Sequence, residues 1–398
     1  MNAGGATVAD VGRSRSALRP HNRVLPSLLV VVAMAAGASG FLTIAPNRLL
    51  SGKPVGLLTA TPLLGGVIIV LGGLLLAASL LAPAPGRHRA AAGLAALLLL
   101  LLLYAAGQGA AATAATRPPL SRVSLGPAFW VLLGASGLAV IDGLQRAQAG
   151  AGERLALAII VAAGAWLLAQ SGNFEALSIT REYHIRQAQF AGAIVRHAAL
   201  VAASVGPAIL LGFPLGIAAV RRPQWQTPLF AGLNLLQTIP SIALFGLLLA
   251  PLSALAVALP LLGTLGVGGV GPAPAIIALI LYALLPVVRN TVAGIGGVEA
   301  AVLDAARGLG MTQRQRFWRV ELPLAAPLLL AGLRIVVVQS IGLAVVAALI
   351  GAGGLGTFVF EGLGQYAVDL VLLGAVPAIL LALTANFLLQ LLIAVVAR

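Results

Sequence analysis

Apolar stretches long enough to cross a bilayer recur along most of this chain, and no other feature of the sequence limits its possible folds as strongly. Of the 398 residues, 60% are hydrophobic and 9% are charged, whereas about a quarter of the residues are charged in an ordinary soluble domain. A helix needs about 20 mostly apolar residues to cross the hydrocarbon core. The sequence therefore predicts an all-α, polytopic membrane bundle and excludes a soluble globular fold.

About ten transmembrane helices are expected. The predicted spans are 24–45, 57–82, 90–108, 125–145, 155–171, 192–219, 228–250, 274–296, 322–347 and 370–396. We expect the first to be retained rather than removed as a signal peptide, because no small-residue cleavage site with a polar mature sequence follows it.

The predicted spans form two groups. Residues 1–171 hold five spans of monotonous Leu, Ala and Gly, and their role stays open. Residues 172–191 are polar and are expected to form an external amphipathic linker. Residues 192–398 hold five spans that carry prolines, amides and recognisable motifs. Function is therefore expected in the C-terminal half.

The formal net charge of +14 comes from 24 basic and 10 acidic residues. Short cytoplasmic loops of membrane proteins collect Lys and Arg. With the N-terminus inside, 15 of the 24 basic residues fall on the inner side of the predicted spans. We therefore interpret the charge as an orientation signal, with both termini cytoplasmic and lipid around the chain, and we expect no nucleic-acid partner.

Catalytic and metal chemistry have few candidate residues. The chain has no Cys, which excludes disulfides and thiolate sites. The histidines lie far apart in the sequence: His21, His88, His184 and His197. We expect no metal site and no catalytic residue.

The most polar long segment of the C-terminal half runs from Gly297 to Pro327 between the eighth and ninth predicted spans. Its first part predicts a short helix with Glu299 and Asp304 early in it, where acids favour the positive end of the helix dipole. Gly310 is expected to end that helix, because glycine readily adopts the left-handed conformation of a C-terminal cap.

A second short helix is predicted to begin at Thr312. Gln315 follows three residues later and completes the pattern of a capping box. Pro323 stands where the first turn of the next span is expected. Although most charged connections are only solvated loops, this one predicts a helix-turn-helix segment that faces the cytoplasm.

The loop also contains short motifs in a fixed order directly before a span. Their residues are Asp304, Ala305, Ala306, Gly308, Gly310, Leu322 and Pro323. This arrangement resembles the permease subunits of ABC importers, whose EAA loop reads E-A-A, then Gly, then a hydrophobic residue followed by x-L-P. Asp304 departs from the Glu of that pattern but keeps its negative charge.

Four further segments resemble one branch of these permeases, the importers of osmoprotectants such as glycine betaine, choline and carnitine. They are 212–216, 234–241, 285–291 and 350–356. The resemblance covers about residues 190–398 and implies a five-helix ABC importer permease core. It also implies a location in the bacterial inner membrane, with this chain as a non-catalytic subunit of the transport pathway.

The resemblance implies that residues 297–323 couple the permease to a cytoplasmic ABC ATPase. The implied coupling residues are Glu299, Asp304, Ala305, Ala306, Gly308, Gly310, Arg314, Arg316, Arg319, Leu322 and Pro323. Further implied partners are an external substrate-binding protein and a second permease, either identical or a paralogue. ATP and magnesium would be bound by the ATPase, because the Gly52-Lys53 pair of this chain precedes Pro54 and lacks a phosphate-binding loop.

Polar residues inside the C-terminal spans are candidates for the translocation pathway. They are Asn234, Gln237, Pro240, Arg334 and Asn386. Arg334 lies 11 residues after Pro323, which places it about 16 Å into the membrane. A cation at that depth must face the bundle or a wet cavity. A structural clamp between helices is an equally open interpretation, and Pro240 is expected to kink its span.

A glycine-rich segment after the ninth span is predicted to form a tight outer turn. Its glycines are Gly351, Gly353, Gly354 and Gly356. They match the dinucleotide pattern G-x-G-x-x-G, but neither a preceding strand nor an acid about 20 residues later supports that function. The permease resemblance suggests that they shape an outer gate, and a plain turn remains the alternative.

Other functions are less well supported. An ABC permease for another small solute, such as an amino acid, remains an alternative. An ion-coupled secondary transporter needs titratable groups near the midplane, but every acid here falls in a loop or near a span end. An intramembrane serine protease would need a histidine deep in a span to act as the base, and no histidine lies deep in another predicted span.

Overall fold

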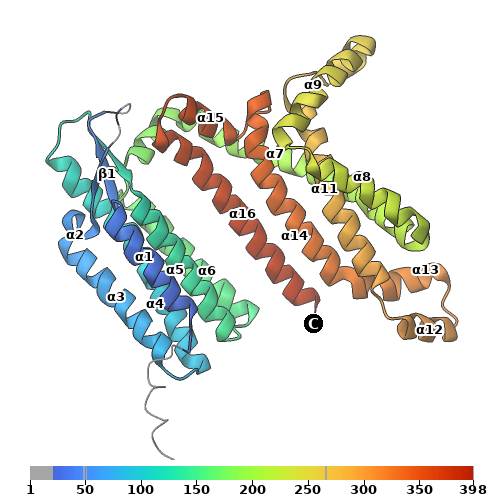
Figure 1. The fold of residues 1–398 in the computed structure, drawn as a ribbon, viewed down its shortest axis with the longest axis horizontal. Coiled ribbons are helices and arrows are strands. Elements are labelled where there is room, and N and C mark those ends of the chain that lie inside the picture. The colour runs from blue at the N-terminus through green and yellow to red at the C-terminus, as the bar shows by residue number, and fades with distance from the viewer. Residues whose placement is uncertain (1–20, 48–49, 51, 265–266, 398) are drawn as a thin grey trace, which may run out of the picture. The chain divides into compact units, whose positions relative to one another are not determined.

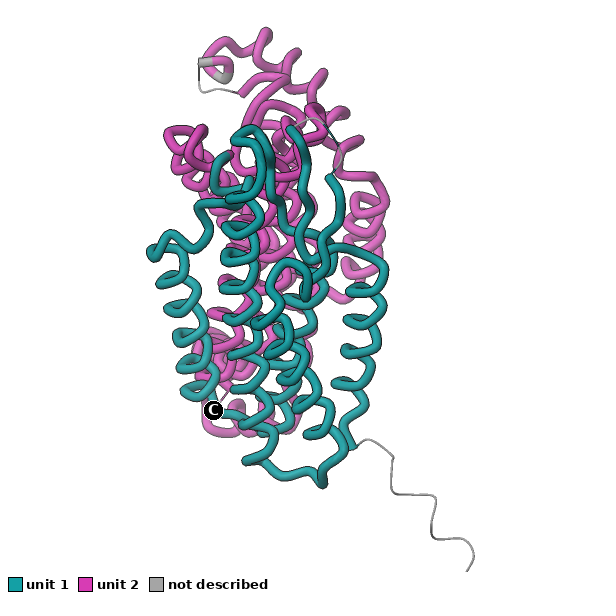
Figure 2. The backbone as a smooth tube through the Cα atoms, turned by 90° about the vertical axis from the view of Figure 1, so that its left-hand side faces the viewer, with its two compact units in different colours: residues 1–181 teal, residues 182–398 magenta. Residues whose placement is uncertain are grey.

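The computed structural model describes residues 21–47, 50, 52–264 and 267–397. They form a predominantly helical protein, and nine of the described helices are long and apolar enough to cross a membrane. A shorter apolar helix, α1 (Val24–Ala38), occupies the first predicted span. The all-α, polytopic fold class is confirmed. The chain divides into unit 1, Met1–Arg181, and unit 2, Glu182–Arg398, which Figure 2 shows in teal and magenta.

Unit 1 is a bundle of α-helices around one apolar core. After α1 its helices are α2 (Leu57–Ala60), α3 (Pro62–Leu80), α4 (Pro85–Ala115), α5 (Pro127–Arg146) and α6 (Ala151–Gln170). The helices α3, α4 and α5 each begin with a proline, whose fixed φ suits the first turn. The fifth predicted span, 155–171, is a helix of 20 residues.

A small antiparallel sheet, which the sequence did not predict, corrects the extent of the first span. Its strands are β1 (Leu42–Ala45), β2 (Lys53–Val55) and β3 (Arg122–Leu125), in the order β2-β1-β3. The predicted span 24–45 is wrong beyond Ala38, where α1 ends. The chain extends there because Phe41 N donates to the carbonyl of Val55, so its backbone pairs with β2 rather than continuing a helix.

Unit 2 contains most of a long helix, α7 (Ser178–Arg221), and the helices that follow it in the chain. These are α8 (Gln226–Thr238), α9 (Ser241–Ala258), α10 (Pro260–Thr264), α11 (Pro272–Gly296), α12 (Ala300–Gly308), α13 (Gln313–Arg316), α14 (Leu322–Val346), α15 (Gly356–Gly364) and α16 (Val368–Val396). Figure 1 shows their arrangement. Two 3₁₀ turns, Pro223–Trp225 and Ala347–Ile350, and a π-helical turn, Phe317–Glu321, join some of them.

Two predicted segments differ in detail from the structure. The expected linker 172–191 includes the start of α7, whose helical geometry is interrupted at Arg186 (φ −116°, ψ 16°). The predicted span 228–250 is two helices, because the chain is extended at Ile239 and Pro240. Proline disfavours the helical conformation of the residue before it, so the expected kink at Pro240 is a complete break.

Close helix packing in unit 2 depends on small residues. A methyl group on Gly212 of α7 would lie 2.7 Å from Val287 of α11. On Gly332 of α14 it would lie 2.5 Å from Asn290, also on α11. Small residues allow helix backbones to approach closely in membranes. The contacts place α11 against both α7 and α14, and each of the three helices has an end at the loop that carries the predicted coupling residues.

Candidate functional site

The predicted helix-turn-helix loop is present, and α12 and α13 project beyond the ends of α11 and α14 (Figure 1). Glu299 is the residue before α12, but its side chain makes no capping hydrogen bond. Gly310 has φ +75°, the left-handed conformation expected at a helix stop. Thr312 Oγ1 accepts from the backbone N of Gln315, and Gln315 Oε1 accepts from the backbone N of Thr312. The capping box is therefore confirmed.

The helix α12 exposes a short apolar stripe. Val302 and Leu309 are 37% and 78% exposed, and Ala305 between them is also exposed. Their spacing of three and four residues places them on one helix face. Ala306 is buried, with 4% of its surface exposed. Of the two alanines in the motif, therefore, only Ala305 belongs to the surface that a partner could contact.

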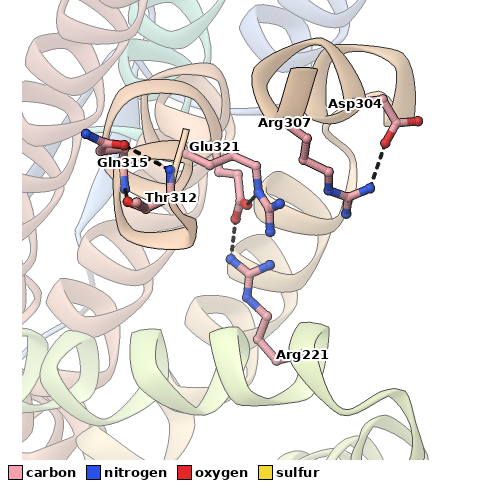
Figure 3. Close-up of polar contacts among 7 residues, drawn as sticks. Arg221, Asp304, Arg307, Thr312, Gln315 and Glu321 are labelled. Carbon is pink, nitrogen blue, oxygen red and sulfur yellow. Dashed lines mark hydrogen bonds and ion pairs between the residues drawn. The ribbon is translucent and has the colours of Figure 1, made fainter. Parts of the chain in front are cut away.

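Asp304 forms a local ion pair in this helix. Arg307 Nη1 donates to Asp304 Oδ1 at 2.6 Å, and both side chains are more than half exposed (Figure 3). Solvent screens such a pair, so it contributes little to stability. Asp304 lies in the middle of α12 rather than at its start. It therefore supplies surface charge and not a helix cap.

A buried ion cluster joins the loop to α7. The Glu321 side chain is 1% exposed, and its Oε1 accepts from Arg316 Nε at 3.0 Å. Its Oε2 accepts from Arg221 Nη2, which lies at the end of α7. Figure 3 shows Arg221 pointing toward Glu321 from its own helix. Two guanidinium groups from separate elements are thus held by one carboxylate.

Sequence reasoning missed Glu321 and Arg221 as site residues. Arg316 was expected to act at the partner's surface, yet only 12% of its side chain is exposed. Arg314 and Arg319 are exposed, as a contact role requires. The sequence did contain one indication of this role. Glu321 is an acidic residue two positions before Pro323, directly at the start of an apolar span.

The loop continues into α14 without a break. The π-helical turn Phe317–Glu321 connects α13 to α14, and the helical run Gln313–Ile350 is 38 residues long. Leu322 and Pro323 form the first residues of α14. Short π-helical segments occur often at functional sites. Continuous helix therefore joins α13 to α14.

The predicted pathway residues fall into separate groups. Gln237 of α8 donates to the carbonyl of Tyr282 on α11 at 2.7 Å, and the Tyr282 hydroxyl donates to the carbonyl of Ile239. Asn234 Oδ1 accepts from Arg289 Nη2 at 3.4 Å. These contacts hold the end of α8, just before Pro240, against α11. Both amides thus take part in contacts between α8 and α11, and their role in the pathway stays a prediction.

Arg334 occupies the midpoint of α14, twelve residues from each end of Leu322–Val346. Its side chain is partly buried, as is that of Asn386 in α16. Among the described residues, neither a hydrogen bond nor an ion pair links Arg334 to Asn234, Gln237 or Asn386. The amide contacts expected for this cation are thus absent from the described part of the chain.

The glycine-rich turn lies at the opposite end of α14 from the loop. Gly351, Gly353 and Gly354 all have φ between +77° and +84°. A methyl group on Gly356 would overlap the carbonyl of Val345. The Ala347–Ile350 segment before the turn is a 3₁₀ helix and not a strand. The geometry is that of a tight turn.

Two residues of α7 that sequence reasoning missed support this turn. Arg196 Nε donates to the carbonyl of Ala352 at 3.0 Å. His197 is fully buried, and its Nε2 lies 3.1 Å from the carbonyl of Ile341. A methyl group on Gly354 would lie 3.2 Å from His197 Nδ1. The turn is therefore packed against α7 and not free in solvent.

Comparisons with known proteins identify the family of the chain. Residues 208–398 match the family described as binding-protein-dependent transport system inner membrane component. The osmoprotectant import permease protein OsmW of Salmonella typhimurium is 42% identical over 195 residues, which are 49% of this chain and 86% of that protein. The chain belongs to this permease family. Residues 22–180 of the permease match the N-terminal domain of the ABC transporter permease YehY.

Further relatives of the permease have related names. The choline transport system permease protein OpuBB of Bacillus subtilis is 39% identical over 190 residues, covering 48% of this chain and 79% of that protein. The carnitine transport permease protein OpuCB of Listeria monocytogenes is 41% identical over 184 residues, covering 45% and 77%. A solved structure of the MetNI methionine ABC transporter has 22% identity and a TM-score of 0.45, and the match covers 52% of this chain and 96% of that one.

Proposed function

We propose that this permease carries a quaternary amine osmoprotectant, such as glycine betaine, choline or carnitine, across the bacterial inner membrane. An external binding protein delivers the solute, and a cytoplasmic ABC ATPase that holds ATP and magnesium drives its import. The second permease of the assembly is a copy of this chain or a paralogue. The names of the relatives support the substrate class.

The observation that carries the proposal is the loop Gly297–Pro323. It presents an exposed apolar stripe, Val302, Ala305 and Leu309, outside the helical bundle. Such a stripe rimmed by charged residues is typical of a protein-binding surface. The ATPase binds α12 there, with Arg314 and Arg319 positioned to pair with its acidic groups.

Motion of the ATPase then reaches the spans by two routes. Through Glu321, the loop holds the end of α7. Through the π-helical turn, it moves α14. Both α7 and α14 pack on α11. A shift of the loop therefore changes the packing of α14, which carries Arg334, and of α11, which holds Asn234 and Gln237 of α8. Changes at these helices open and close the pathway.

Solute uptake tests this function. The permease is expressed with its ATPase and binding protein in cells that lack other osmoprotectant importers, and uptake of labelled glycine betaine, choline and carnitine is compared with that of amino acids. We expect ATP-dependent uptake of at least one quaternary amine. Uptake of amino acids alone would reassign the substrate, and uptake driven by an ion gradient without the ATPase would contradict the proposal.

Two loop variants test the coupling role. Asp304→Lys reverses the charge at the contact surface, and Gly310→Pro replaces a residue whose φ is +75°, which proline is unable to adopt. We expect both chains to insert into the membrane at normal levels but to lose coupling between ATP hydrolysis and uptake. Wild-type uptake by both variants at normal expression would refute the assignment of the loop.

A further inference from the structure

A small basic cavity lies at one end of unit 1. The start of α1, the α3–α4 connection and the last residue of α5 enclose a volume of ≈ 30 Å³. His21, Arg87, His88 and Arg146 are among the residues that line it. The cavity lies in unit 1, whose role is not explained by the coupling loop or by the spans of unit 2.

The walls of the cavity are held by hydrogen bonds and close packing. The backbone N atoms of His21 and Asn22 donate to the carbonyl of Ser79 at 3.0 and 3.2 Å. Asn22 Nδ2 donates to Asp142 of α5 at 2.6 Å. A methyl group on Gly143 of α5 would lie 3.0 Å from the carbonyl oxygen of His88. The four helix ends that form the cavity are therefore fixed relative to one another.

The cationic groups around the cavity keep unused donors. Arg146 donates Nε to Asp142, and Arg87 donates one Nη to the carbonyl of Ala82. In the part of the chain that the structure describes, the remaining guanidinium nitrogens and the imidazoles of His21 and His88 meet no hydrogen-bonding partner. Asp142 offsets the charge of Arg146 and leaves that of Arg87. The cavity thus offers several N–H donors and a net positive charge.

Size and position indicate the chemistry of the ligand. A cavity of ≈ 30 Å³ accepts a group of one or two water volumes, whereas sites for drug-sized ligands measure about 300–1,000 Å³. The cavity lies at the ends of α3 and α5, two helices that are long and apolar enough to cross a membrane, so we place it at the level of the lipid head groups. The arginine distribution predicts that this end faces the cytoplasm, where the leaflet is rich in anionic lipids.

We propose that this cavity binds the phosphate of an anionic phospholipid head group. Basic pockets between membrane helices on the cytoplasmic side bind such groups. Arg87 supplies the charge, and His21, His88 and the free nitrogens of Arg146 donate to the phosphate oxygens. The bound lipid anchors the start of α1 and the α3–α4 connection at the membrane surface, and it gives unit 1 a lipid-sensing site.

Native mass spectrometry of the purified transporter complex tests the site. The complex is released from nanodiscs that contain equal amounts of phosphatidylglycerol and phosphatidylcholine. We expect the wild-type complex to retain phosphatidylglycerol in preference to phosphatidylcholine. An Arg87→Gln variant loses one cationic contact, so its affinity for phosphatidylglycerol falls about fivefold. His88→Gln, combined with Arg87→Gln, lowers the affinity further.

Arg89→Gln is the matched control. Arg89 lies in the same first turns of α4, but it pairs with Glu153 and does not line the cavity. We expect this variant to retain phosphatidylglycerol as the wild type does. Equal loss in Arg89→Gln and Arg87→Gln would show diffuse attraction and overturn the site, as would equal retention of both lipids by the wild type.

Two further measurements keep the result independent of variant folding. A photoactivatable phosphatidylglycerol is expected to label residues 21–25 or 78–91 of the wild-type chain. Labelling spread evenly around the bundle would contradict the proposal. In the second measurement, inorganic phosphate is added in excess to the lipid-loaded complex. Continued retention of the lipid supports a head-group site. Complete displacement of the lipid, with phosphate bound in its place, would assign the cavity to a soluble anion and overturn the lipid proposal.

Discussion

Glu321 shows how much a single carboxylate determines in this permease. It is 1% exposed and shared by Arg221 and Arg316, so the two guanidinium groups depend on one partner. Removing one member of a buried pair leaves an uncompensated charge. The residue therefore matters for the stability of the loop as well as for its connection to α7.

The first prediction concerns this residue. Glu321→Gln leaves Arg316 nearly buried without a counter-charge, so we expect a loss of about 3 kcal/mol in unfolding free energy. Thermal unfolding in detergent measures the change. Asp304→Asn is the matched control, because the Asp304–Arg307 pair is exposed and its loss changes stability by less than about 1 kcal/mol. Equal midpoints for both variants would contradict the assigned role of Glu321.

The second prediction compares two glycines of the loop, neither of which has a neighbour that an added methyl group would touch. Gly310 has φ +75°, whereas Gly308 is the last residue of α12. Gly310→Ala should cost about 1–2 kcal/mol, because an L-residue is strained in the left-handed region. Gly308→Ala should be neutral or slightly stabilising.

Hydrogen exchange of the α12 and α13 amides measures this difference. We expect faster exchange in Gly310→Ala and unchanged or slower exchange in Gly308→Ala. The same exchange rates in both variants would show that the backbone conformation of Gly310 does not hold the loop.

At the scale of elements, the contact between α7 and α11 sets how closely the spans of unit 2 pack. Gly212 and Gly216 are four residues apart and lie against Val287 and Thr291. This spacing places both glycines on one helix face. The contact explains the presence of these two glycines in a span that otherwise favours Leu and Ala.

The third prediction tests that contact. Gly216→Leu inserts a side chain where even a methyl group would lie 2.5 Å from Thr291, so we expect α7 to separate from α11 and the yield of monodisperse protein to fall severalfold. Gly206→Leu, on the same helix with open space around it, should retain the wild-type yield. Size-exclusion chromatography measures both. A normal elution profile for Gly216→Leu would refute the packing argument.

Elements set by local chemistry were predictable from the sequence, and those set by distant partners were not. The capping box of Thr312 and Gln315 and the stop at Gly310 depend on residues a few positions apart. The pairing of Glu321 with Arg221 joins positions 100 residues apart, which no local pattern encodes. The strands around Thr43 were missed because a short apolar strand after a helix has the same composition as the end of a span.

At the scale of the whole molecule, the match to OsmW covers 86% of that protein with 49% of this chain. Unit 2 also has apolar clusters of its own. Residues 22–180 and 208–398, which match two different family models, therefore account for most of the length of the chain.

The fourth prediction follows from this division. A chain that begins at Ser178, where α7 starts, should insert into the membrane and support uptake when produced with the ATPase and the binding protein. Uptake assays with matched expression levels measure this. Loss of all uptake by a correctly inserted truncated chain would show that unit 1 is needed for transport itself.

The unbroken helical run Gln313–Ile350 has a mechanical consequence. At 1.5 Å per residue its 38 residues extend about 57 Å, almost twice the thickness of the hydrocarbon core of a bilayer. Tilting a rod of this length about its middle would move its two ends in opposite directions. Such a tilt would link the position of the coupling loop at one end of the run to that of the glycine-rich turn at the other.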